Sequence, residues 1–166
     1  METLVKELVG KTRYVWWLTG STLDKVEPFY CAGLPDYSVV RQLGCNCAGL
    51  INLICHIKGL PVADMAIRHY WAGGTSVWFD YLMKAGRLQA FDPEASYRAG
   101  ALLLRNFSSL EDQGHLAILY SSGPVLTQQL LHCTPDTGIT IDTCVKTSND
   151  WLGGGYYTHV CVDWIV

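Results

Sequence analysis

The sequence has little charge and no run of basic residues. Only 16% of its 166 residues are charged, and the formal net charge is −3. Surfaces that bind nucleic acid or an anionic membrane normally carry clustered lysine and arginine. We therefore expect neither nucleic acid nor a membrane surface among the partners of this protein.

Long apolar runs and an export signal are also lacking. The longest apolar stretches fall well short of the roughly 20 residues that a transmembrane helix needs. The N-terminal residues include Glu2 and Glu7 and have no continuous apolar core, unlike a signal peptide. These features predict no membrane span. The expected location is the cytoplasm, and the alternative is an unknown location.

The cysteines lack the pattern of a disulfide framework or of a common zinc site. There are seven of them at irregular spacing, so we expect most or all to be free thiols. No pair has the CxxC spacing that zinc sites often use. We expect no metal and no cofactor. The less favoured alternative is a zinc site that draws on Cys31, Cys45, Cys47, Cys55, His56, His132 and Cys133.

The composition is that of one folded domain. Hydrophobic residues make up 49% of the chain, which is enough for a core, and the length fits a single domain over residues 1–166. Helical patterns come first and strand patterns second. The predicted helices cover residues 2–9, 47–58, 62–71 and, capped by Thr75 or Ser76, the segment up to Gly86. The predicted strands cover residues 101–107, 115–120, 125–133, 139–145 and 156–166. This order predicts an α+β fold, with N-terminal helices packed on one side of a central antiparallel sheet.

Residues 44–59 form the stretch around which the remaining chemistry is organised. Asn46 is a good helix N-cap residue, which places Cys47 at the first helical position. The free N–H groups and the positive end of the helix dipole favour an anion there. We therefore predict a lowered pKa for Cys47 and a reactive thiolate. The apolar residues that follow predict a buried helix that stops at Gly59.

A reactive thiol needs a base, and two histidines are well placed to serve it. His115 opens a predicted strand, and His132 lies near the end of the next one. In an antiparallel pair the start of one strand lies beside the end of the next, so these histidines can be neighbours. The pattern predicts a nucleophile, a base and an orienting group, namely Cys47, His115 and His132.

These residues carry a resemblance to a known family. Residues 46–50 (Asn-Cys-Ala-Gly-Leu) resemble the Asp-Cys-Ser-Gly-Leu motif of NlpC-type papain-like cysteine peptidases. Further segments resemble motifs of that family in the same order: residues 14–16 with Gly20, residues 100–103, residues 114–119 and residues 130–133. The resemblance implies a papain-like fold and hydrolysis of amide bonds in cell-wall (peptidoglycan) peptides.

The resemblance also implies roles for individual residues. His115 would accept the Cys47 proton to form a thiolate–imidazolium pair, and the thiolate would attack a carbonyl to give an acyl-enzyme. The Cys47 N–H and, by analogy with the family, the Tyr14 hydroxyl would stabilise the oxyanion. The third catalytic residue is His132, with Gln128 or Gln129 as alternatives because the interval after His115 is longer than the family pattern.

Two other functions use the same residues. A thiol acyltransferase or thioesterase would share the acyl-enzyme, and a binding module would keep the fold without the activity. The changed neighbours of the thiol, Asn46 and Ala48, are compatible with the binding module.

Overall fold

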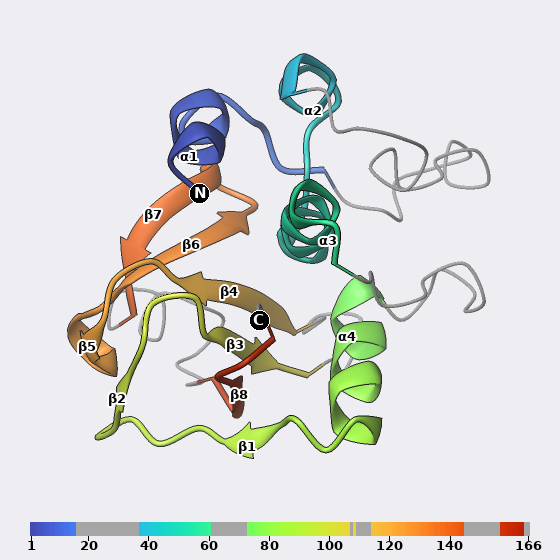
Figure 1. Cartoon of the computed structure of the whole chain (residues 1–166). Helices are drawn as coiled ribbons and strands as arrows, with labels where there is room; N and C mark the ends of the chain where they lie inside the picture. Colours follow the sequence, from blue (N-terminus) through green and yellow to red (C-terminus); the bar gives the residue numbers. More distant parts are fainter. Residues whose placement is uncertain (16–36, 61–72, 107, 109–113, 145–156, 165–166) are drawn as a thin grey trace.

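A computed structural model describes residues 1–15, 37–60, 73–106, 108, 114–144 and 157–164. The fold is α+β, as predicted, with a six-stranded antiparallel sheet and few helices (Figure 1). The helices are α1 (Glu2–Leu8), α2 (Tyr37–Leu43), α3 (Cys47–Lys58) and α4 (Gly73–Lys84). The sheet has the strand order β1 (Gln89–Ala90), β8 (His159–Cys161), β3 (Leu102–Arg105), β4 (His115–Leu119), β6 (Gln129–Thr134) and β7 (Gly138–Thr143). A separate two-stranded ribbon pairs β2 (Ser96–Tyr97) with β5 (Gly123–Pro124).

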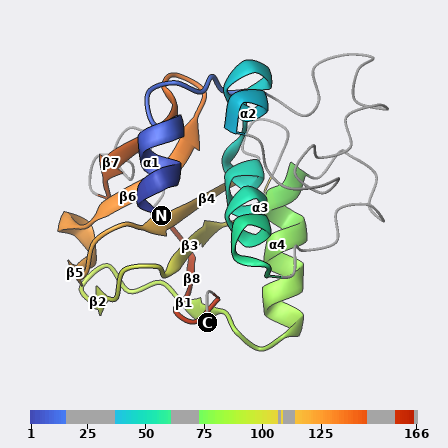
Figure 2. The same cartoon turned by 45° about the horizontal axis from the view of Figure 1, so that its top comes forward.

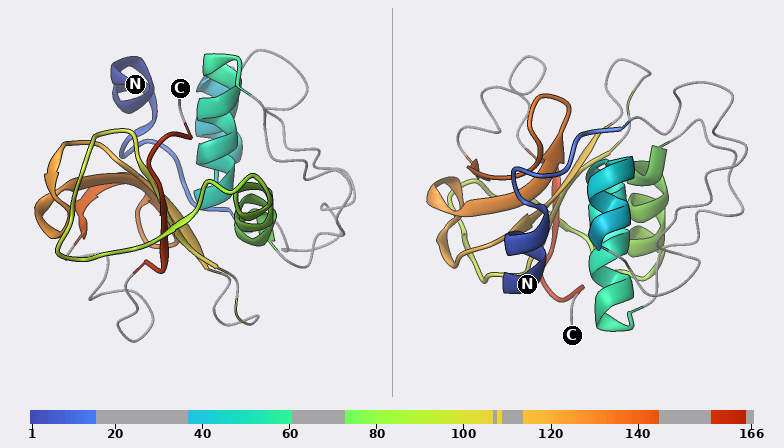
Figure 3. Two further views of the ribbon diagram at one scale, coloured as in Figure 1. Left: turned by 60° about the horizontal axis from the view of Figure 1, so that its bottom comes forward. Right: turned by 90° about the horizontal axis from the view of Figure 1, so that it is seen from above.

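Two helices cover one face of the sheet. Helix α3 contacts β4 and β6, while α4 packs beside α3 and contacts β3 (Figures 2 and 3). Helix α1 lies near β7, where the Gly10 N–H donates to the Ile139 carbonyl over 2.9 Å. Among the helices that the structure describes, none is long and apolar enough to cross a membrane.

The two central strands are buried on both faces. On one face Leu104 and Leu116 pack with the residues of α3, and on the other Leu103 and Ala117 belong to a second apolar cluster. Because side chains alternate along a strand, His115 shares the face of Ala117, and Ala117 lies opposite His132 in the register. Both histidines therefore project from the sheet face that α3 does not cover.

Most of the predicted elements are confirmed, with changes at their ends. The predicted helices at 2–9 and 47–58 correspond to α1 and α3, and the segment that closes at Gly86 corresponds to α4. The predicted helix at 62–71 lies outside the described residues. Helix α2 was not predicted.

The prediction that Thr75 or Ser76 caps α4 was wrong, because the helix starts at Gly73. The strand predicted from residue 125 begins only at Gln129, since Val125–Thr127 form a short 3₁₀ turn after Pro124.

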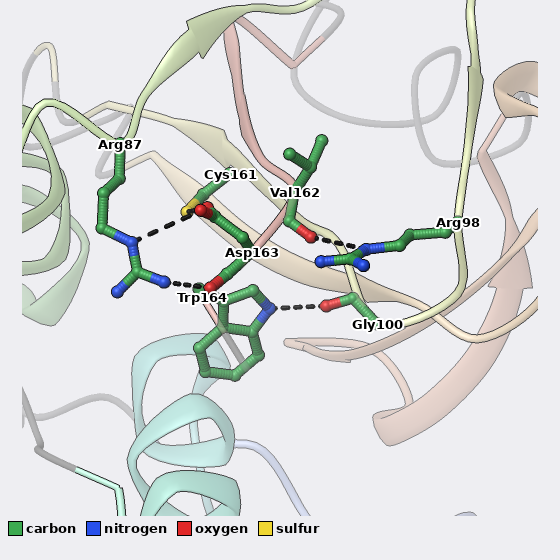
Figure 4. A network of polar contacts seen from close by, with 7 residues as sticks. All are labelled: Arg87, Arg98, Gly100, Cys161, Val162, Asp163 and Trp164. Atoms are coloured by element: carbon green, nitrogen blue, oxygen red, sulfur yellow. Dashed lines mark hydrogen bonds and ion pairs between the residues drawn. The ribbon is translucent and has the colours of Figure 1, made fainter. Parts of the chain in front are cut away.

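The last described segment leaves the sheet earlier than its alternation predicts. Strand β8 ends at Cys161, and residues 162–164 turn away from the sheet. The Arg98 Nε donates to the Val162 carbonyl over 3.0 Å, and the Trp164 Nε1 donates to the Gly100 carbonyl over 2.6 Å (Figure 4). These bonds connect the end of β8 to the loop before β3 instead of to a longer ladder.

Candidate active site

The start of α3 is built as the sequence predicts. The Asn46 Oδ1 accepts a hydrogen bond from the Gly49 N–H over 2.7 Å, which is N-cap geometry, and Cys47 is the first helical residue. At the other end Gly59 has φ 65°, and the Leu60 N–H donates back to the Cys55 carbonyl over 2.8 Å. A capped, buried helix thus fixes the position of the Cys47 side chain.

The Cys47 thiol lies where β4 and β6 separate. The ladder between these strands begins at the pair Ala117↔His132, so the residues of β4 before Ala117 lie beyond its end. There the Cys47 Sγ accepts the N–H of Leu116, the residue that follows His115. The Thr75 hydroxyl of α4 lies 3.9 Å from the same sulfur atom. The thiol is only 7% exposed.

The predicted low pKa of Cys47 was wrong. Burial raises the pKa of this thiol above its ordinary value, and the hydrogen bonds from Leu116, Thr75 and Ala48 only partly oppose that rise. A half-charge of helix dipole at the first turn does not replace the water that a thiolate loses on burial. Cys47 is therefore a neutral thiol at neutral pH in this structure.

His115 and His132 are in direct contact. The Nε2 of His115 lies 3.0 Å from the Nδ1 of His132, and both rings are almost fully buried. Burial lowers the pKa of His115 well below its ordinary value, with further contributions from nearby His132 and Arg105. His115 is thus a neutral imidazole at neutral pH, in the form that can accept a proton.

Gly114 sets the start of the histidine strand. It has φ +74°, and a Cβ at this position would lie 2.3 Å from the Arg105 carbonyl oxygen on the neighbouring strand. Only glycine fits such a close approach of two backbones. The fold therefore requires glycine at position 114, directly before the proposed base His115.

Asp142 is a site residue that the sequence reasoning missed. Its Oδ2 lies 3.3 Å from the Nε2 of His132, so β4, β6 and β7 contribute consecutive members of one polar chain. Leu130 faces Asp142 in the register, and His132 lies two residues further along β6 on the same face. A carboxylate within a predicted strand was the available signal, but only the register of β6 and β7 places it beside His132.

Two tyrosines lie near the thiol. Tyr14 forms an isolated parallel bridge with Cys45, and burial together with Cys47 raises the pKa of its hydroxyl. Tyr157 packs near the His115 ring with 6.1 Å between ring centroids, and Cys47 contributes to the raised pKa of Tyr157 as well. Tyr14, the predicted oxyanion donor, thus interacts electrostatically with Cys47, and so does Tyr157, which the sequence did not indicate.

The glutamines lie elsewhere. The Gln128 Nε2 donates to the backbone carbonyls of Tyr97 and Ser121, and Gln129 is exposed. The geometry therefore places His132, and neither glutamine, against His115.

Two further thiols, those of Cys45 and Cys133, lie near Cys47. The Cys133 Sγ donates to the Cys45 carbonyl over 3.3 Å, and both residues are buried free cysteines. Within the described ranges no three histidine, cysteine or acidic side chains are grouped so that they could hold a metal ion. Cys31 of the zinc alternative lies outside these ranges.

No protein-family model and no curated protein matches this chain significantly. What the site can do is therefore argued from its geometry. The site holds a neutral thiol at a helix N-terminus, where its sulfur accepts the N–H of Leu116, and a hydrogen-bonded chain of imidazole, imidazole and carboxylate groups that begins at the preceding residue, His115. A thiol and an imidazole at one end of a strand are the groups that nucleophilic catalysis with general-base assistance uses.

Proposed function

We propose that this protein is a cysteine hydrolase of the NlpC-type papain-like class, with Cys47 as nucleophile, His115 as general base and His132 as orienting residue. The contact of 3.0 Å between His115 and His132 carries the proposal. Both rings are buried, so this contact satisfies hydrogen-bonding groups that water cannot reach. In a catalytic site the second imidazole holds the first in its working tautomer.

The position of Cys47 supports the same role. The sulfur accepts the N–H of Leu116, which directly follows His115 in β4, so nucleophile and base approach the same end of one strand. The helix N-terminus also provides N–H donors, including that of Cys47, for a developing oxyanion. The Tyr14 hydroxyl remains the candidate for the second donor.

The pKa directions define how the reaction starts. Because the pKa of Cys47 is raised and that of His115 is lowered, the resting pair is neutral thiol and neutral imidazole, and no preformed ion pair exists. His115 then takes the proton as the sulfur attacks the carbonyl, and the acyl-enzyme and the free amine follow when His115 returns that proton. Water afterwards hydrolyses the thioester and regenerates Cys47.

The substrate class comes from the resemblance. The motif around Cys47 favours amide bonds in cell-wall-type peptides, whereas a thiol acyltransferase or thioesterase would use the same acyl-enzyme. Digestion of defined cell-wall peptides by the wild type and by Cys47→Ala, with products read by mass spectrometry, tests the proposal. Cleavage by the wild type alone supports it. Cleavage by both proteins, or by neither, contradicts the peptidase proposal.

Two observations favour a second candidate, a binding module without activity. The raised pKa of Cys47 and its 7% exposure are also what a merely structural thiol would have. Iodoacetamide labelling of Cys47 near neutral pH, followed by peptide mass spectrometry, separates the two. A working base predicts that His115→Ala slows Cys47 labelling at least about tenfold. Cys55 in the same helix is the internal control.

An unchanged rate of Cys47 labelling in His115→Ala would favour the binding module. A parallel change at Cys55 would instead report a general opening of α3. The two thiols lie on the same helix and both are buried, with Cys47 at the first residue of the helix and Cys55 further along it.

A further inference from the structure

We propose that Asp142 is a positioning residue that sets the direction of the hydrogen bonds through both imidazoles and thereby makes Nδ1 of His115 the atom that accepts the thiol proton. This inference rests on the proposed function and deepens it. It begins from the two contacts of the polar chain, 3.3 Å between Asp142 and His132 and 3.0 Å between His132 and His115.

The direction follows from the chemistry of the terminal group. An ionised carboxylate has no proton and can only accept a hydrogen bond. The Nε2 of His132 must therefore carry the hydrogen that it shares with Asp142. A neutral imidazole has one N–H, so the Nδ1 of His132 is left as an acceptor.

The second link has the same direction. Because the Nδ1 of His132 accepts, the Nε2 of His115 must donate across the 3.0 Å contact. The lone pair of His115 then lies on Nδ1, the ring nitrogen directed away from His132. Through these two hydrogen bonds, a single carboxylate thus selects which nitrogen of His115 is the base.

The location of Asp142 suits this purpose. Its side chain is 18% exposed, whereas that of His132 is 2% exposed, so the carboxylate lies where the polar chain meets solvent. The proton transferred from Cys47 to His115 stays on His115, and Asp142 favours the imidazolium electrostatically without being protonated.

Nitrogen-15 NMR of the imidazole rings tests the inference without any substrate. The probe is uniformly labelled protein, with the signals of its five histidines assigned by single substitutions. In the wild type we expect His132 and His115 each to show a protonated Nε2 and an unprotonated Nδ1. In Asp142→Ala and Asp142→Asn at least one ring should lose this fixed tautomer and show a mixed or reversed one.

The matched control is Asp136, which is exposed in the turn between β6 and β7. Asp136→Ala and Asp136→Asn should leave both tautomers unchanged. Two results would overturn the inference: tautomers that are the same as the wild type's in both Asp142 variants, or a wild-type His132 that carries protons on both nitrogens.

Activity separates this inference from the function on which it rests. If peptides are cleaved, the Asp142 variants should lose about tenfold or more in kcat with little change in KM, and Asp142→Glu should recover part of the loss. Tautomers that respond to Asp142 without any cleavage would leave the hydrogen-bond direction set by Asp142 standing, and would remove the hydrolase together with the role of His115 Nδ1 as proton acceptor. Cleavage that does not depend on Asp142 would remove the inference alone.

Discussion

The cap of α3 offers the sharpest stability test, because one side chain holds the frame of the proposed nucleophile. In Asn46→Ala the Gly49 N–H loses its acceptor at 2.7 Å. Loss of an N-cap costs about 1 kcal/mol, and a buried N–H left without a partner adds about 1 kcal/mol or more. Asn46 is only 5% exposed, so water does not readily replace the amide oxygen. The expected loss is about 2 kcal/mol.

Urea denaturation followed by circular dichroism measures this loss. For a chain of this length about 2 kcal/mol corresponds to a fall in Tm of about 4–8 °C. Asn46→Asp is the matched variant, since it keeps the acceptor and restores the residue of the resembled motif. Its carboxylate also favours the helix N-terminus, so its stability should stay within about 0.5 kcal/mol of the wild type.

The aspartate variant makes a second prediction for the thiol. A carboxylate beside Cys47 should raise the pKa of that thiol further and slow its labelling. A loss of less than about 0.5 kcal/mol in Asn46→Ala would refute the cap reasoning. An equal loss in the alanine and aspartate variants would refute it too, because the acceptor would then be irrelevant.

Three further predictions concern the frame of the site. Gly114→Ala should destabilise the protein by more than about 2 kcal/mol in urea denaturation, since its Cβ would lie 2.3 Å from a backbone oxygen; a neutral outcome would disprove the close approach. Burial raises the pKa of Cys55 to about 12, so above pH 9 the unfolded chain ionises first and stability falls as pH rises. Between pH 8 and 10, Cys55→Ala should reduce that fall by about 1 kcal/mol, and identical pH profiles would contradict the raised pKa. Trp78→Phe removes the 2.7 Å bond to Asn52 and should cost about 2 kcal/mol in thermal unfolding; the same cost in an Asn52→Ala background would show that the bond contributes nothing.

The elements with strong local signals could be predicted. The α3 helix has a capping residue, an apolar body and a glycine stop, and all three act within a few residues of one another. The strands at 102–105 and 115–119 were found because continuous apolar runs bounded by turns leave few alternatives. Helix α2 carries weaker local signals and was missed. The end of β8 depends on bonds to Arg98 and Gly100, which lie about 60 residues earlier in the sequence.

The same distinction between local and long-range signals holds for the residues of the site. The sequence indicated His115 and His132, because antiparallel strands bring the start of one beside the end of the next. The sequence did not indicate Asp142, because the contact between Asp142 and His132 depends on the register of β6 and β7. A shift of one residue in that register would move the Asp142 side chain to the other face of the sheet. The sequence also indicated the wrong direction for the pKa of Cys47.

The sequence by itself thus determined the α+β order, the capped helix and the types of residue that could carry out thiol chemistry. These properties follow from local rules, namely helix caps, the alternation of side chains and the glycine positions. Only the tertiary structure decided which groups meet and whether they are charged. Burial of Cys47 is a property of the whole packed chain, so it overrides the local preference of a helix N-terminus for an anion.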